Sequence, residues 1–119
     1  MAGRISPRAQ ARLAVLKELD LAVLRAHGLV ERFAAAKTDH ETHAIALRRA
    51  FRKLKQDFTG AGLDALAQLA GGMEIAAARG TSPTTKTRIL RDAIGSMRFQ
   101  LESDISTILR EEREKDEEE

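Results

Sequence analysis

The sequence predicts an all-α fold, an antiparallel four-helix bundle. Apolar residues recur in alternating steps of three and four along four successive segments, which is the spacing of helices with one buried face. The 119-residue chain is rich in Ala, Leu, Arg and Glu and has no Trp or Tyr, and its common residues lose little freedom in a helix. Short connections rich in Gly, Ser, Thr and Pro separate the segments, as in bundles of antiparallel helices.

The first helix is expected to begin where Ser6 precedes Pro7, because Ser caps helix N-termini and Pro fits the first helical position. Its apolar stripe consists of Leu16, Leu19, Val23, Ala26, Val30 and Phe33. The second helix is expected to begin at Thr38, with Glu41 at the spacing of a capping box, and to end at residues 60–62. Its stripe consists of Ala44, Leu47, Phe51, Leu54 and Phe58.

The third helix is expected over about residues 63–78, and the segment 81–85 is the clearest loop. The buried face of the third helix is expected to contain Leu66, Leu69, Met73 and Ala77. The stripe of the fourth helix consists of Leu90, Ile94, Met97, Leu101, Ile105 and Ile108. We therefore expect one helical-bundle domain over residues 1–109 and an acidic tail over residues 110–119. This tail either extends the last helix or is disordered.

The charge is unevenly distributed, although the formal net charge is only +2. The tail has seven acids and three bases, a net charge of −4, so the first 109 residues carry about +6. No apolar run approaches the roughly 20 residues of a membrane span, and the N-terminal Arg residues precede no apolar signal region. We expect a cytoplasmic protein without a membrane partner.

The sequence offers little for catalysis. It has no Cys, which excludes thiolate catalysis and zinc–thiolate sites. His40 and His43 could share a helix face, but two nitrogens without a nearby carboxylate or third histidine make a poor metal site, so we expect them to be solvated. The Ser and Thr residues at positions 81–87 have no evident partner base. We expect no enzyme, no cofactor, no metal and no small-molecule substrate.

A basic cluster lies on the second helix and consists of Arg48, Arg49, Arg52, Lys53 and Lys55. At about 100° per residue, Arg48, Arg52 and Lys55 share one side of this helix, and Arg49 and Lys53 lie further round. Ile45, two turns before Arg52, is expected on the same exposed face. The cluster has no interleaved aromatic residues, so a solvated basic face is favoured over a nucleic-acid partner.

The spacing around Arg52 resembles that of histidine-phosphotransfer domains, in particular the N-terminal domain of chemotaxis histidine kinases. That family has a Lys three residues after its phospho-accepting His, a Gly ten after it and, in the chemotaxis branch, a Glu 22 after it. With Arg52 at the His position, Lys55, Gly62 and Glu74 occupy these offsets. The apolar offsets are matched by Leu63, Leu66 and Leu69. The resemblance covers nearly the whole chain at low identity and implies a bacterial two-component signalling role.

Two departures from this family's pattern matter. Arg52 replaces the phospho-accepting His, and a guanidinium that stays protonated cannot accept a phosphoryl group. Gln56 replaces the Gly that lets a response regulator approach closely. The resemblance thus implies a phosphotransfer fold without phosphotransfer. Because the family's Glu orients the imidazole, we expect Arg52 and Glu74 to form an exposed ion pair.

The leading hypothesis is therefore a binding module that docks an acidic partner, a response-regulator receiver domain or another signalling protein. Its expected partner-binding residues are Ile45, Arg48, Arg49, Arg52, Lys55, Gln56 and Glu74. Two alternatives remain. One is a structural or homo-oligomerising bundle, which the heptad-like stripes of the first and fourth helices favour. The other is a nucleic-acid-associated protein that uses the basic cluster.

Overall fold

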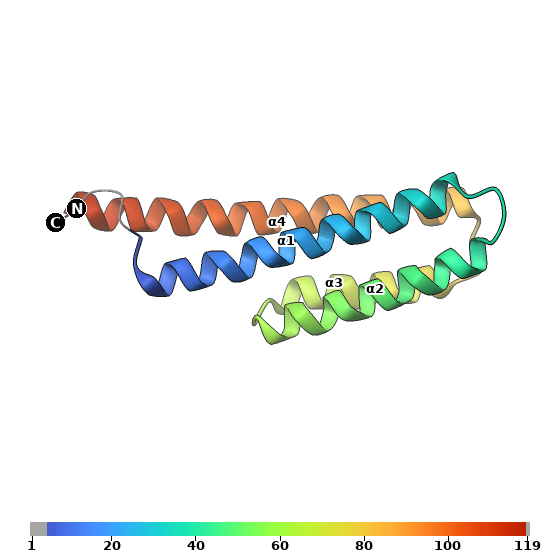
Figure 1. Ribbon diagram of the computed structural model, residues 1–119, viewed down its shortest axis with the longest axis horizontal. Helices are drawn as coiled ribbons and strands as arrows, with labels where there is room; N and C mark the ends of the chain where they lie inside the picture. The colour runs from blue at the N-terminus through green and yellow to red at the C-terminus, as the bar shows by residue number, and fades with distance from the viewer. Residues whose placement is uncertain (1–4, 119) are drawn as a thin grey trace.

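Two layers of paired helices make up the molecule, which confirms the expected all-α bundle. The computed structural model describes residues 5–118 of the chain. Its helices are α1 (Pro7–Ala35), α2 (His40–Gly60), α3 (Asp64–Ala78) and α4 (Pro83–Glu118). Figure 1 shows the long helices α1 and α4 side by side in one layer and the shorter α2 and α3 in the other. The α2–α3 hairpin covers only part of the length of the α1–α4 pair (Figure 1).

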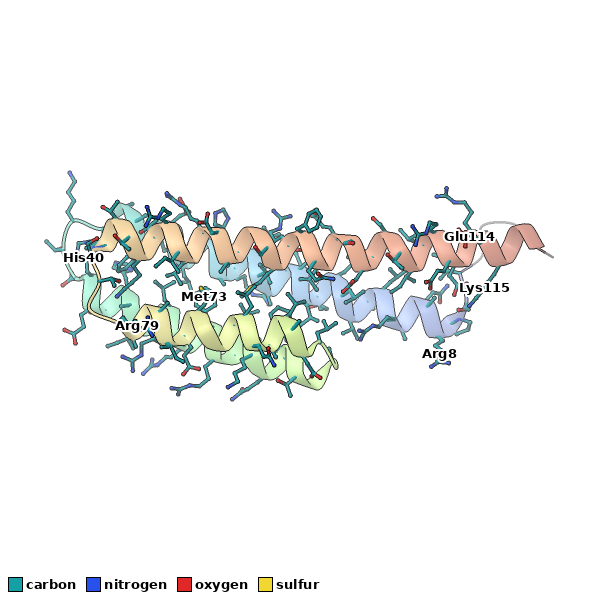
Figure 2. All side chains as sticks on the ribbon, turned by 180° about the vertical axis from the view of Figure 1, so that it is seen from behind. Arg8, His40, Met73, Arg79, Glu114 and Lys115 are labelled. Carbon is teal, nitrogen blue, oxygen red and sulfur yellow. The ribbon has the colours of Figure 1, made fainter. Side chains whose placement is uncertain are left out.

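The core lies between the two layers and contains the stripe expected for α1 and, apart from the half-buried Ala44, the stripe expected for α2. Phe33, Phe51 and Phe58 are among its largest fully buried side chains. In α3 the packing differs from the expectation, because Leu69 and Met73 are only partly buried. Two small residues, Ala67 and Ala70, are buried instead, and small side chains let helices approach closely. Met73 still points from α3 toward the α1–α4 layer (Figure 2).

Helix α1 begins as expected, whereas α2 does not. The hydroxyl of Ser6 accepts a hydrogen bond from the backbone N–H of Ala9 at 3.2 Å, and Pro7 occupies the first turn. The prediction that Thr38 caps α2 is wrong, because the capping position belongs to Asp39. Asp39 adopts a left-handed backbone with φ of 60°, which Asp tolerates better than most residues, and its side chain makes no capping hydrogen bond.

The connection between α3 and α4 is shorter than expected. We predicted a loop over residues 81–85, but α4 begins at Pro83. The hydroxyl of Ser82 accepts a hydrogen bond from the backbone N–H of Thr85 at 3.2 Å, so Ser82 caps this helix. The Ser–Pro pair at 82–83 is thus the same start signal as Ser6–Pro7.

Helix α4 continues through the acidic segment. Residues 110–118 are helical, which is the first of the two options for the tail. The hydroxyl of Ser6 donates a hydrogen bond to Oε1 of Glu112 at 3.0 Å, so the start of α1 is bonded to the end of α4. Among residues 5–118, no helix combines the length and the apolar character needed to cross a membrane.

Candidate functional site

The basic residues of α2 lie on its outward side because its apolar residues face inward. Leu47, Phe51, Leu54 and Phe58 are buried at helical spacing. Most of the positions between them are exposed, and these include Arg48, Arg49, Arg52, Lys55 and Gln56. We call these five residues, together with Glu74 of α3, the basic surface.

An ion pair joins the two helices at the centre of the basic surface. The Nε atom of Arg52 donates to Oε2 of Glu74 at 2.9 Å, which confirms the pair expected from the sequence. The Arg52 side chain is 60% exposed and the Glu74 side chain 22% exposed. The guanidinium therefore keeps donors that face solvent and can bind a second carboxylate.

Lys55 lies across α3 beside this pair. A methyl group added at Gly71 would lie 3.3 Å from Cδ and 3.6 Å from Nζ of Lys55. The alkyl stem of Lys55 therefore rests on bare backbone at Gly71 and keeps its ammonium group near α3. The tight turn that brings α2 against α3 contains Gly62, whose positive φ of 76° suits glycine.

The charges of this surface are only partly neutralised. Arg52 pairs with Glu74, and Lys53, which is next to Arg52 in the chain but outside the surface, pairs with Asp57 at 3.2 Å. In the part of the chain that the structure describes, Arg48, Arg49 and Lys55 form no ion pair. The surface thus has an excess of positive charge, which favours an acidic partner.

Three of the expected partner-binding residues lie at the margins of the surface. Ile45 and Arg48 line a cavity of about 220 Å³ that also contacts Ala77 and Ala78 at the end of α3. Gln56 lies on the opposite margin, in a groove shared with Ala22 of α1. The structure therefore brings Arg52, Lys55 and Glu74 together, and places Ile45 and Gln56 on either side of them.

The histidines do not form a site with one another. The ring of His40 packs edge-on against Phe33, with ring centroids 5.5 Å apart, so His40 is half-buried and not solvated as expected. It lies at the end of the bundle where the helix connections meet (Figure 2). Within residues 5–118, no group of three His, Cys, Asp or Glu side chains is placed to hold a metal ion.

Sequence reasoning missed Lys86, a buried lysine in the same cavity as Ile45. Lys86 is only 7% exposed, and its Nζ donates to the backbone oxygen of Ala77 at 3.0 Å. It also lies 5.6 Å from the centroid of the Phe33 ring. Burial lowers the pKa of Lys86 from its usual value. The sequence did contain a signal for this burial, because Lys86 is four residues before Leu90 and in line with the apolar stripe of α4.

Comparisons with protein-family models, with curated proteins and with solved structures give no match to this chain.

Proposed function

We propose that this chain is a non-catalytic module, similar to a histidine-phosphotransfer domain, that docks a receiver domain or a related two-component signalling protein. The observation that carries the proposal is the pairing of Arg52 with Glu74 at 2.9 Å, with Lys55 beside it on the same exposed side of the bundle. The resemblance assigns these three residues to the positions of the acceptor His, its Lys and its orienting Glu.

The module carries no phosphate on α2. The side chain of Arg52 is a guanidinium, which has only N–H donors and no lone pair available to accept a phosphoryl group. His40 and His43 precede Arg52 by twelve and nine residues, which corresponds to about 18 and 14 Å along a helix at 1.5 Å per residue. Neither histidine can therefore take the place of the missing acceptor beside Lys55 and Glu74.

Electrostatic attraction brings the partner to the basic surface. The phosphorylation pocket of a receiver domain is acidic, and Arg48, Arg49 and Lys55 supply positive charge that no described carboxylate neutralises. Complementary charges increase the association rate and orient the encounter. Binding should therefore weaken as salt increases, because exposed charges are screened over about 8–10 Å at physiological ionic strength.

Charge reversal tests this docking. We expect Arg52→Glu to weaken binding to a cognate receiver domain by about tenfold or more, since it places a carboxylate beside Glu74 and opposite an acidic pocket. Arg8→Glu is the matched control, because Arg8 is exposed and lies at the other end of the molecule from His40 (Figure 2). Equal binding by the wild type and Arg52→Glu to every receiver tested would count against the proposal.

Rebuilding the acceptor tests the relation to phosphotransfer. The double variant Arg52→His with Gln56→Gly restores the two family residues that this chain lacks. We expect it to take up radioactive phosphate from a phosphorylated receiver, while the wild-type chain takes up none. Uptake of phosphate by the wild type at His40 or His43 would contradict the proposal of a non-catalytic module.

A further inference from the structure

The outer face of the α1–α4 layer exposes an apolar patch that the proposed docking to a receiver does not use. Phe99 is 75% exposed, Leu21 49% and Leu24 38%. These residues belong to α1 and α4, on the layer opposite the α2–α3 hairpin (Figure 1). Single exposed apolar residues are ordinary, so their relative positions decide whether they form one surface.

Two ion pairs define how α1 and α4 lie against each other. Arg98 pairs with Asp20 at 3.4 Å, and Arg91 pairs with Glu31 at 2.6 Å. Higher residue numbers of α4 thus lie beside lower ones of α1, as in antiparallel helices. The two ion pairs therefore bound a stretch of the α1–α4 face in which residues 20–31 of α1 lie beside residues 91–98 of α4.

The apolar residues fall between or beside these ion pairs. Leu24 is one turn after Asp20, and Gly95 is one turn before Arg98, so Leu24 and Gly95 lie opposite each other between the pairs. Leu21 and Phe99 directly follow Asp20 and Arg98 in the chain, and a step of about 100° turns both of them outward. Leu21, Leu24 and Phe99 therefore form one patch, which we call the Phe99 patch.

The surface around Phe99 leaves room for a neighbour. Apart from the chain neighbours and the backbone of the same helix, no heavy atom lies within 4 Å of a methyl group added at Gly95 or Gly28. Gly95 is one turn before Phe99, so the area next to the exposed ring has no side chain at that position. An aromatic ring beside such an area is typical of the residues that anchor protein interfaces.

The charges around the Phe99 patch balance. Five bases and five acids lie on this stretch of α1 and α4, over residues 17–31 and 88–102: Lys17, Arg25, Arg88, Arg91, Arg98, Glu18, Asp20, Glu31, Asp92 and Glu102. Arg98 also pairs with Glu102 at 3.2 Å. In a two-fold contact the same face meets itself, so a face of one charge sign repels its copy and a neutral face does not. The balance therefore favours a second copy of this chain over a strongly acidic or basic partner.

The face is large enough for such a contact. α1 and α4 lie side by side over the 29 residues of α1, about 43 Å at 1.5 Å per residue, and two adjacent helices are about 20 Å across. The resulting area of roughly 850 Å² is comparable with the roughly 800 Å² per partner of a standard stable interface. We propose that the chain forms a two-fold homodimer through the α1–α4 face, anchored by Phe99.

Sedimentation equilibrium of the full chain from micromolar to several hundred micromolar tests this proposal. The wild type should reach the dimer mass within that range. Phe99→Asp should raise the dimer dissociation constant by at least about 100-fold, because a two-fold interface loses the anchor twice. The matched control is Ile75→Asp, which makes the same kind of change at an exposed apolar residue of α3 and should dimerise like the wild type.

Three results would overturn the homodimer. They are a wild type that stays monomeric at the highest concentration, a Phe99→Asp variant that dimerises like the wild type, and an Ile75→Asp variant that is impaired to the same degree as Phe99→Asp. A monomeric wild type that binds phosphatidylcholine vesicles, with loss of binding in Phe99→Asp, would assign the patch to a membrane surface instead. Receiver binding is measured separately, so failure of either proposal leaves the other standing.

Discussion

The Nε atom of Arg52 lies 2.9 Å from Oε2 of Glu74, which connects two helices at an exposed position. At this exposed position water can replace either partner of the ion pair. The pair therefore places charge on the surface but adds little to the free energy of unfolding. We expect Arg52→Ala and Glu74→Ala each to change the free energy of unfolding by about 0–1 kcal/mol. A double-mutant cycle in urea measures the coupling, and a coupling of several kcal/mol would contradict a surface role.

Lys55 depends on the absence of a side chain at Gly71. Gly71→Ala and Gly72→Ala both replace Gly within α3, where Ala is favoured by about 0.5–1 kcal/mol. Gly72 has open space around it, so its variant should gain this stability in full. The added methyl at Gly71 meets the Lys55 stem at 3.3 Å, so its variant should gain less.

The Lys55→Ala background separates these two effects. Removing the Lys55 stem should make Gly71→Ala as stabilising as Gly72→Ala in thermal or urea unfolding. A persistent difference between the two variants in this background would mean that Lys55 does not rest on Gly71.

Lys86 should make stability depend on pH. Because burial lowers its pKa in the folded chain, the unfolded chain binds more protons between that lowered pKa and the usual value of 10.5. The contribution of Lys86 to the free energy of unfolding should therefore rise as pH increases through this window.

The Lys86→Met variant tests this dependence. Comparing urea unfolding of the wild type and the variant between pH 7 and pH 10 isolates the contribution of Lys86. The free energy of unfolding of the variant should not rise in this way with pH. It should also be about 1 kcal/mol lower than that of the wild type, because the backbone oxygen of Ala77 loses its hydrogen bond. Identical pH profiles for both proteins would rule out a titrating Lys86.

The pairing of Arg91 with Glu31 should be visible in a titration. The hydrogen bond from Arg91 lowers the pKa of Glu31, so this carboxyl contributes stability that is present above its usual pKa and lost as pH falls through the lowered value. We expect Arg91→Gln to raise the pKa of Glu31 toward its usual value. Carbon NMR of the carboxyl group measures it, and an unchanged pKa would contradict the α1–α4 register described above.

Periodicity and capping predicted much of the fold because both are local. The apolar stripes and the Ser6–Pro7 start follow from helix geometry alone. Asp39, and not Thr38, occupies the capping position of α2, because the backbone of the short connection is left-handed at Asp39. The spacing of residues in the sequence does not reveal this conformation. Ser82–Pro83 carried the same signal as Ser6–Pro7, but its neighbouring Thr residues favoured a longer loop.

The candidate site was predictable only in part. The offset of 22 residues from Arg52 to Glu74 predicted their pairing through the family resemblance. The burial of Lys86 depends on where α3 ends, because its ammonium group bonds to Ala77, and the exposure of Phe99 depends on which helices cover α4. Both are properties of the packed bundle and not of any single helix.

The most direct test of the docking proposal is an NMR titration of the isotope-labelled chain with receiver domains from its source organism. Binding through the basic surface predicts chemical-shift changes that cluster on Arg48, Arg52, Lys55 and Gln56, with residues near Phe99 unaffected. Shift changes confined to other parts of the chain, or none with any receiver, would contradict this account. The homodimer through the Phe99 patch would then be the better-supported role for the chain.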